Sequence, residues 1–361
     1  MRTLLLHPRG FARGFVALLV ALTLIGFALP GRAETPCAGS FCWIERGFAG
    51  QEFTALVSPP GYPCIVAWTA LSGGGLELST DCGVQYSKLF GPSAYDVTAR
   101  DENVGYVAAG ELGIAKTRDG GGTWVAINAG LPPTLDARAI LLHTAHPEST
   151  FCALYGAGVF LGGPTGATID SFLWAPINEG LGDLGVRALG RARGGSFMIA
   201  ATDGGIWRRG NNVWSLVAPG LLANAIVIDS ADSSRVYAAT ENGVYRSLNQ
   251  GMSWIPSSSG MPGGTAVNDI ARRSEGPNVL YAGTRGQGVW ESVDYGASWR
   301  AFGPALPGDN DARAVLCAVG GMAADSAAVF VGTRNNGLFQ AGYSTPAIPS
   351  TWGQLKDRYR H

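Results

Sequence analysis

The sequence predicts an all-β protein: a seven-bladed β-propeller of four-stranded blades, with the ring closed by an N-terminal strand. Three observations lead to this prediction. The chain has 361 residues, of which only 15% are charged and 53 are glycine, a composition that favours strands joined by tight turns. Aromatic markers recur at roughly 40–50 residue spacing, within the range of propeller repeats. Each interval holds four short apolar runs separated by Gly-containing turns, the pattern of one blade.

An eight-residue motif marks several of these blades. It reads Ser/Thr, any residue, Asp/Asn, any residue, Gly, any residue, Ser/Thr, Trp. Three complete copies occupy residues 117–124, 247–254 and 292–299, through Asp119, Gly121, Trp124, Asn249, Gly251, Trp254, Asp294, Gly296 and Trp299. A worn copy at residues 79–86 contains Asp81 and ends in Tyr86, and Trp174 and Trp214 mark two blades without the motif. A seventh blade, from Asp311 to Gln340, lacks both the motif and a clear fourth strand.

This motif resembles the Asp-box, or bacterial neuraminidase repeat, and the resemblance covers about residues 40 to 342. It implies a member of the Asp-box propeller superfamily, which includes sialidases. The single-propeller relatives that look most similar are non-catalytic, of the photosystem II assembly factor type or the sortilin type. We interpret the motif as structural. Its Asp or Asn hydrogen-bonds the turn, its Gly occupies a restrictive turn position, and its Trp buries a large apolar face.

The missing fourth strand of the last blade is predicted at the N-terminus. Residues 41–47 resemble a fourth strand with its aromatic, Trp43, although no blade precedes them. We expect this segment to pair with the third strand of the last blade, because this closes the ring and covers an exposed sheet edge. The alternative is an N-terminal tail without partners.

The two ends of the chain carry further segments. Residues 1–33 resemble an export signal, with Arg2, Arg9 and Arg13 before an apolar run and a cleavage site before Glu34. The run is short of the ~20 residues that span a bilayer. We therefore predict a secreted or periplasmic protein without a membrane span after cleavage; an uncleaved anchor is the alternative. The propeller occupies residues 34–344. Residues 345–361 form a tail, either docked or frayed, or a sorting tag.

The six cysteines divide into two groups. Export permits disulfides. The turn between the first two strands of a blade lies at the same end as the motif turn, so we predict a bond between Cys64 and Cys82. Short spacing suggests a second bond between Cys37 and Cys42. Cys152 and Cys317 lie within apolar strands and are predicted to be buried free thiols. The cysteine and histidine spacing matches no zinc site, and we predict neither a metal nor a cofactor.

The candidate site lies at the end of the propeller opposite the motif. Aligned first strands place six residues at equivalent positions around the channel mouth: Tyr95, Arg138, Arg187, Asn224, Asn268 and Arg313. Arg285 and Arg334 stand in nearby turns. Guanidinium groups bind carboxylates and phosphates through a rigid fork. Carboxylates are also close, in Glu111, Asp136, Asp203, Glu241 and Asp311, so the alternative is that these pairs only hold the loops.

These residues indicate binding rather than catalysis. The net charge of −1 gives no basic excess, which argues against nucleic acid. We predict a monomeric, exported, non-catalytic scaffold that binds a protein partner or an acidic glycan through the Arg-bearing face. The alternative is a sialidase-like glycoside hydrolase, since sialidases combine this motif with an arginine triad and a Tyr–Glu pair. The Arg-Ile-Pro motif of those enzymes is absent and Tyr95 has no evident Glu partner, so no catalytic residue is assigned.

Overall fold

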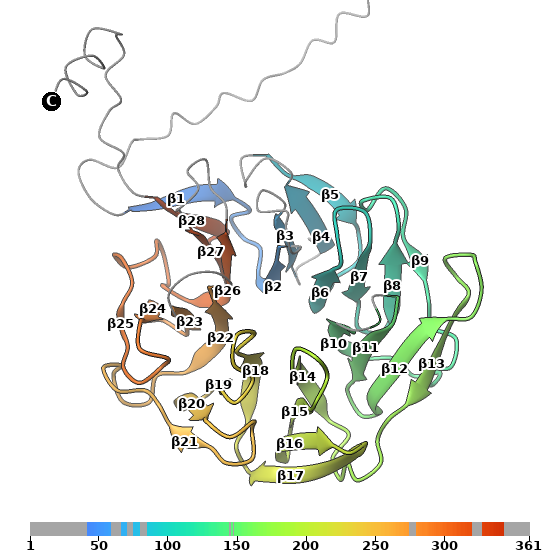
Figure 1. Cartoon of the computed structure of the whole chain (residues 1–361). Helices are drawn as coiled ribbons and strands as arrows, with labels where there is room; N and C mark the ends of the chain where they lie inside the picture. The colour runs from blue at the N-terminus through green and yellow to red at the C-terminus, as the bar shows by residue number, and fades with distance from the viewer. Residues whose placement is uncertain are drawn as a thin grey trace, which may run out of the picture. The chain divides into compact units, whose positions relative to one another are not determined.

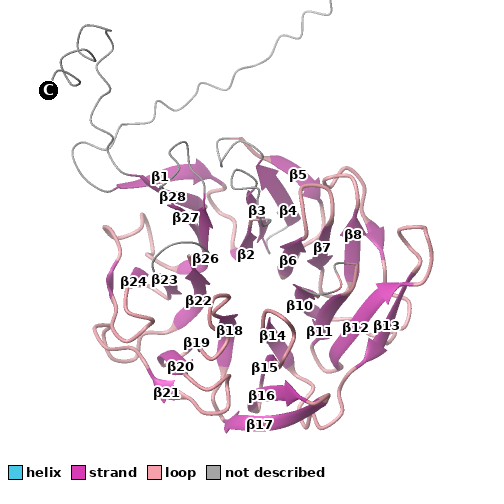
Figure 2. Cartoon of the chain, viewed as in Figure 1, coloured by secondary structure: helices cyan, strands magenta, loops and turns pink. Residues whose placement is uncertain are grey.

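Strands and loops alone make up the described part of the chain in the computed structural model (Figure 2). The described residues are 42–58, 66–70, 75–79, 85–143, 146, 148–273, 279–319 and 327–342. The chain divides into two units, Met1–Thr35 and Pro36–His361, and all described residues belong to the second. The predicted export signal and the tail at 345–361 lie outside the described residues.

The described strands form seven four-stranded antiparallel sheets, arranged as blades around a common centre (Figure 1). The prediction of an all-β propeller with four-stranded blades is confirmed. We number the blades in chain order, so that blades 1 to 6 run from β2–β5 to β22–β25, and blade 7 combines β26, β27 and β28 with β1.

Every blade has an innermost, a second, a third and an outermost strand. The innermost strands are β2 (Phe53–Val57), β6 (Asp96–Ala99), β10 (Ala137–Leu142), β14 (Val186–Arg191), β18 (Ala223–Ile228), β22 (Val267–Arg272) and β26 (Ala312–Val319). The second strands are β3 (Val66–Ala70), β7 (Gly105–Ala108), β11 (Thr150–Leu154), β15 (Met198–Thr202), β19 (Val236–Thr240), β23 (Leu280–Thr284) and β27 (Ala327–Thr333). The third strands are β4 (Gly75–Ser79), β8 (Ile114–Thr117), β12 (Gly158–Pro164), β16 (Gly205–Gly210), β20 (Gly243–Ser247), β24 (Gly288–Ser292) and β28 (Leu338–Gly342). The outermost strands are β5 (Ser87–Phe90), β9 (Val125–Ala126), β13 (Phe172–Pro176), β17 (Val213–Pro219), β21 (Ile255–Pro256), β25 (Arg300–Ala301) and β1 (Cys42–Gly47).

The N-terminal strand β1 completes the last blade. It pairs antiparallel with β28, with Trp43 opposite Ala341, which is the pairing predicted for this segment. The Trp43 indole Nε1–H donates to the carbonyl of Pro304 in the preceding blade (2.8 Å). The innermost strands contact one another in blade order, and β26 also contacts β2.

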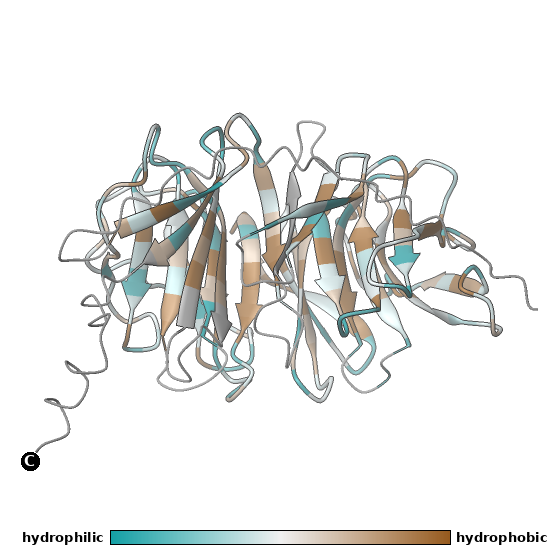
Figure 3. Ribbon diagram, turned by 90° about the horizontal axis from the view of Figure 1, so that it is seen from above, coloured by the Kyte–Doolittle hydropathy of each residue, from teal (hydrophilic) through white to brown (hydrophobic). Residues whose placement is uncertain are grey.

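Seen from the side, the strands run between two loop-bearing faces (Figure 3). We call one the mouth face: there the innermost strands begin, the second and third strands are joined, and each blade connects to the next. The other is the box face, which carries the turns between first and second strands and between third and fourth strands. This division follows from the antiparallel order of every sheet.

The hydrophobic core lies between neighbouring blades. One cluster joins Tyr106 and Ile114 of blade 2 to Phe172 and Trp174 of blade 3, and a comparable cluster joins blades 5 and 6. Two indoles, one on the outermost strand β17 and one directly before the outermost strand β25, also bind the preceding blade through their ring N–H. Trp214 donates to the Ile177 carbonyl and Trp299 to the Ser257 carbonyl, both at 2.7 Å. Each of these tryptophans therefore fixes one blade to its neighbour.

The three complete motif copies, which we call the box turns, share one set of hydrogen bonds. In the first, Asp119 accepts from the Thr117 hydroxyl (2.8 Å) and from the Thr123 amide (2.9 Å), while the Gly121 amide donates to Thr117 Oγ1 (2.9 Å). Equivalent bonds surround Asn249 and Asp294. These bonds hold the pKa of the Asp119 carboxyl at about 2. In the fourth, worn copy at residues 79–86, Asp81 lies outside the described residues.

Three of the six cysteines are described. Cys152 and Cys317 are free and buried, as predicted. Cys42 is disulfide-bonded. Cys37, Cys64 and Cys82 lie outside the described residues, so the predicted pairings of Cys64 with Cys82 and of Cys37 with Cys42 remain predictions.

Candidate functional site

A β-bulge presents the candidate residues at the mouth. Where each of six innermost strands begins, its register with the second strand shifts, so that two residues oppose one. The extra residue at this bulge is Arg138, Arg187, Asn224, Asn268 or Arg313 in blades 3 to 7, and Thr54 in blade 1. Tyr95 lies directly before β6. Bulges commonly redirect one side chain out of the sheet, which explains why a single sequence position recurs around the mouth.

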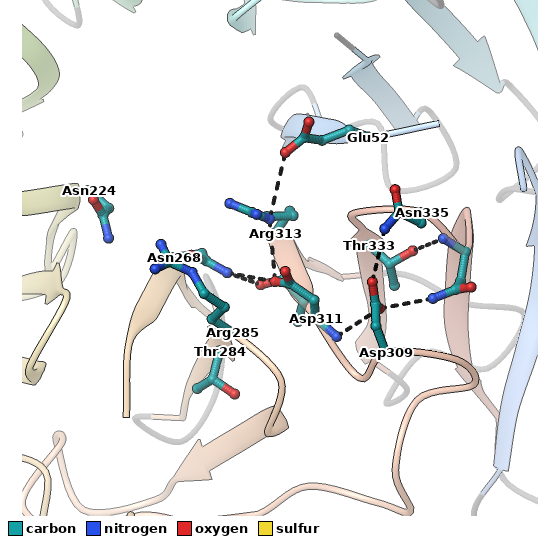
Figure 4. A network of polar contacts seen from close by, with 12 residues as sticks. Glu52, Asn224, Asn268, Thr284, Arg285, Asp309, Asp311, Arg313, Thr333 and Asn335 are labelled. Atoms are coloured by element: carbon teal, nitrogen blue, oxygen red, sulfur yellow. Dashed lines mark hydrogen bonds and ion pairs between the residues drawn. The ribbon is translucent and has the colours of Figure 1, made fainter. Parts of the chain in front are cut away.

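Each of four mouth arginines is engaged by a carboxylate. Arg138 contacts Asp136 (Nε–Oδ1 2.7 Å) and Arg187 contacts Asp203 (Nε–Oδ1 2.5 Å). Arg285 binds both oxygens of Glu241, each at 2.9 Å. Arg313 lies between Asp311 (3.3 Å) and Glu52 (3.7 Å), as Figure 4 shows. These four arginines are therefore paired with carboxylates, as the structural alternative in the sequence analysis expected.

The two asparagines join neighbouring blades. Asn224 Nδ2 donates to the Val267 carbonyl (2.9 Å), and Asn268 Nδ2 donates to the Ala312 carbonyl (2.8 Å), one blade further on. Asn268 Nδ2 also lies 3.1 Å from Asp311 Oδ1 (Figure 4). These amides bind the first residue of the next innermost strand, so both are committed to holding the ring together. Arg334 is exposed, and its backbone amide donates to the Asp311 carbonyl (3.2 Å).

Tyrosine and arginine alternate along the mouth from blade 2 to blade 4. The Arg138 guanidinium lies 4.0 Å from the Tyr95 ring centroid and 5.8 Å from that of Tyr155. On the other side, the Arg187 guanidinium lies 5.5 Å from the Tyr155 ring centroid. The Tyr155 hydroxyl donates to Asp203, the carboxylate that also binds Arg187. We call these four residues, Tyr95, Arg138, Tyr155 and Arg187, the Tyr–Arg row.

Sequence reasoning missed Tyr155. It directly follows β11, in the turn between the second and third strands of blade 3. The corresponding turns of blades 4, 5 and 6 carry Asp203, Glu241 and Arg285. Aligning those turns, and not only the first strands, would have found it. The Tyr155 side chain is 40% exposed, so its ring is accessible from solvent.

The row borders a cleft of about 340 Å³ between blades 2 and 3. Tyr95, Arg138 and Asp136 line it together with Glu111 and Leu112. The hydrogen bonds from Tyr155 and Arg187 hold the pKa of Asp203 below its usual value. Burial alone would raise the pKa of Glu241, but bonds from Arg285 and Asn224 bring it below the usual value. Both carboxylates are therefore ionised at neutral pH.

Acidic groups outnumber basic ones on the mouth face. Its described arginines are Arg138, Arg187, Arg285, Arg313 and Arg334. Its described carboxylates are Glu52, Glu111, Asp136, Asp183, Asp203, Glu241, Asp309 and Asp311. The Arg-bearing face predicted from the sequence is thus a mixed surface with an acidic excess, because carboxylates of the neighbouring loops pair with its guanidinium groups.

The described residues contain no metal centre and no membrane-spanning helix. No three His, Cys, Asp or Glu side chains among them are grouped to hold a metal ion. Nor does the described part of the chain include a helix long and apolar enough to cross a bilayer.

Comparisons with known proteins support the fold. No protein-family model matches the sequence. A xyloglucanase of Hypocrea jecorina is 29% identical over 202 residues, covering 43% of this chain and 24% of the relative, so the chain spans about a quarter of that protein.

Solved structures cover more of the chain. YCF48 from Cyanidioschyzon merolae superposes with a TM-score of 0.61 at 13% identity, over 84% of this chain and 98% of YCF48. A structure of YCF48 bound to D1 peptide gives 0.59 at 15% identity, over 84% and 97%. The extracellular domain of a putative hybrid two component system from B. thetaiotaomicron gives 0.62 at 14% identity, over 86% of this chain and 41% of that one. These likenesses show the β-propeller fold.

Proposed function

We propose that this chain is an exported, non-catalytic scaffold that binds a segment of a protein partner at its mouth face. The observation that carries the proposal is the Tyr–Arg row beside the cleft between blades 2 and 3. Tyrosine and arginine are enriched among residues that dominate binding energy at protein interfaces. The carboxylates that hold Arg138 and Arg187 fix their orientation before a partner arrives, which lowers the entropy cost of binding.

The charge of the mouth face favours a protein over an acidic glycan. An acidic glycan would meet more carboxylates than guanidinium groups there, and like charges across an interface oppose association. A polypeptide offers backbone N–H and C=O groups to the exposed polar side chains, and apolar side chains to the tyrosine rings. YCF48, which shares this fold, has been solved with a bound peptide, and extracellular domains also occur among the similar structures. Both facts support an exported protein-binding role.

The alternative is a glycoside hydrolase, and the similarity to part of a xyloglucanase is the observation in its favour. A sialidase-like site would direct three arginines at one carboxylate of the substrate. Here Arg138, Arg187 and Arg313 are each held by a different carboxylate. An assay with a fluorogenic sialoside and with xyloglucan oligosaccharides tests this alternative, and turnover of either substrate would replace the scaffold proposal.

The direct test uses an array of peptides that tile the exported proteins of the source organism, with a glycan array in parallel. Arg187→Glu and Tyr155→Ala alter exposed members of the row, since the Arg187 side chain is 56% exposed. Arg300→Glu is the matched control, because Arg300 is 70% exposed and also paired with a carboxylate, but lies on the outermost strand β25. We expect both row variants to lose peptide capture and the control to keep it. Capture that survives both row variants would contradict the proposal.

A further inference from the structure

Carboxylates outnumber guanidinium groups around the Tyr–Arg row. Four described carboxylates lie on the mouth face of blades 2 to 4, in the turns and connections that flank the row: Glu111, Asp136, Asp183 and Asp203. The same part of the face has two described guanidinium groups, those of Arg138 and Arg187. The surroundings of the row therefore have an excess of two negative charges.

Both arginines of the row are already bound. Arg138 presents Nε and Nη2 to the two oxygens of Asp136, at 2.7 and 2.9 Å. Arg187 is held by Asp203, which also accepts from the Tyr155 hydroxyl. A carboxylate brought by a partner would have to displace Asp136 or Asp203 before it could bind the fork of a guanidinium group. The row is therefore poorly suited to an acidic partner.

The other two carboxylates, Glu111 and Asp183, pair with no cation among the described residues. Asp183 is half-buried and accepts from the backbone amides of Gly185 (2.9 Å) and Gly204, which fix its position but bring no positive charge. Glu111 is exposed and lines the cleft between blades 2 and 3. A cation brought by a partner could pair with either carboxylate without breaking an existing ion pair, so the charges favour a basic partner.

An exposed leucine follows each of these two carboxylates in the chain. The Leu112 side chain is 53% exposed and that of Leu184 is 39% exposed. The Leu184 carbonyl accepts from the Gly156 amide (2.9 Å), in the turn that carries Tyr155. Leu112 lines the cleft that the row borders. The row is therefore flanked, on blade 2 and again at the start of blade 4, by an anionic and an apolar side chain together.

We infer that the partner segment bound at the Tyr–Arg row is basic and apolar. Its Lys or Arg side chains pair with Glu111 and Asp183, and its apolar side chains cover the two leucines. This inference rests on the proposed function and adds the chemical class of the partner. Complementary charges speed association and reject partners of the wrong sign, while the apolar surface removed from water contributes to affinity.

The experiment uses three synthetic peptides of one length, in which Leu alternates with Lys, with Gln or with Glu. Binding of each fluorescein-labelled peptide to the purified full chain is measured by fluorescence anisotropy. We expect the Lys peptide to bind about three- to tenfold more tightly than the Gln peptide, because it forms two exposed ion pairs. The Glu peptide should bind more weakly than both. The preference for Lys should shrink as the salt concentration rises.

Two variants locate the binding. Glu111→Gln and Asp183→Asn should each weaken binding of the Lys peptide about two- to fivefold and leave the Gln peptide unaffected. Glu102→Gln is the matched control: Glu102 is also exposed and without an ion pair in the described part of the chain, but it lies in the box-face turn between β6 and β7. Thermal unfolding shows whether each variant folds. If Asp183→Asn does not, Glu111→Gln carries the test.

Equal or tighter binding of the Glu peptide would overturn the inference. So would equal losses in Glu111→Gln and Glu102→Gln, or no binding of any of the three peptides. Self-association of the chain that the Lys peptide reverses would assign the surface to a second copy and would also overturn it. The peptide array tests the proposed function separately: capture that is lost in Tyr155→Ala, without enrichment of Lys and Arg among the captured peptides, would leave the scaffold in place and remove only its basic partner.

Discussion

The carboxylate of Asp96 binds the backbone of the neighbouring blade: its Oδ2 accepts a hydrogen bond from the Ile140 amide of β10 (2.9 Å). Its Oδ1 accepts from the Val97 amide (2.8 Å). Asp269 repeats this arrangement four blades on, accepting from Val315 and Ile270. The other innermost strands have alanine at the equivalent position: Ala55, Ala139, Ala188, Ala225 and Ala314. Two of the seven junctions between innermost strands thus include a half-buried carboxylate.

The first prediction concerns the pH dependence of stability. Burial raises the pKa of Asp96 from 3.8 to about 7, and that of Asp269 to about 6. Because the folded state binds these protons more tightly than the unfolded chain, their contribution to the free energy of unfolding is complete below pH 3.8 and is lost as pH rises through the folded-state values. Asp96→Asn should make the free energy of unfolding, measured with urea, fall less steeply between pH 3.8 and about 7. Asp119→Asn is the control. The pKa of Asp119 is lowered in the folded state, so this carboxylate makes the free energy of unfolding rise with pH. An unchanged slope in Asp96→Asn would refute this prediction.

The second prediction separates a steric clash from backbone strain. Gly180 and Gly156 have nearly the same φ, 80° and 82°, in the region that disfavours other residues. A Cβ at Gly180 would lie 2.4 Å from the Trp214 carbonyl oxygen of the next blade, whereas at Gly156 nothing lies within 4 Å. Gly156→Ala should cost about 1 kcal/mol of unfolding free energy. Gly180→Ala should cost a further 1–3 kcal/mol or so, because a backbone atom has to move. Equal losses in urea unfolding would show that Gly180 is not a close contact between blades.

The third prediction tests the indole bonds between blades. Trp214→Phe leaves the half-buried Ile177 carbonyl without its donor and should lower the free energy of unfolding by about 1–3 kcal/mol. Trp254 provides the comparison, since its indole donates within its own turn, to Gly251 (3.1 Å), and its ring is half-buried. Trp254→Phe should therefore cost less in the same urea experiment. A larger effect at Trp254 would argue against blade-to-blade bonding as the role of Trp214.

The fourth prediction concerns the free thiols. Burial raises the pKa of Cys317 to about 11 and raises that of Cys152 as well. A thiolate is the reactive form of cysteine, so neither side chain should react with a thiol reagent near neutral pH while the protein is folded. Peptide mass spectrometry after labelling, with and without urea, measures this. Modification of Cys152 in the folded protein would mean that its strand opens.

The predicted architecture depended on features that are local in sequence. The Ser/Thr-x-Asp/Asn-x-Gly pattern encodes its own turn, because the side chains of Thr117 and Asp119 bond to groups within four positions of themselves. The spacing of those turns, with period-two apolar runs between them, then determines four-stranded blades. The partner of β1 could be inferred as well, since the last repeat lacked one strand and only one unassigned strand existed.

The character of the candidate site was decided by tertiary structure. The sequence places Arg187 in a first strand and Asp203 in the turn after the second strand, and it does not give their distance; their ion pair helps make the Arg-bearing face a mixed surface. The cleft between blades 3 and 4 shows the same limit: the missing motif of blade 4 is visible in the sequence, but only the structure shows that His143 of blade 3 and Arg209 of blade 4 line one cleft. Repeats encode their own turns and strands, whereas the charge of a surface depends on side chains that meet across blades.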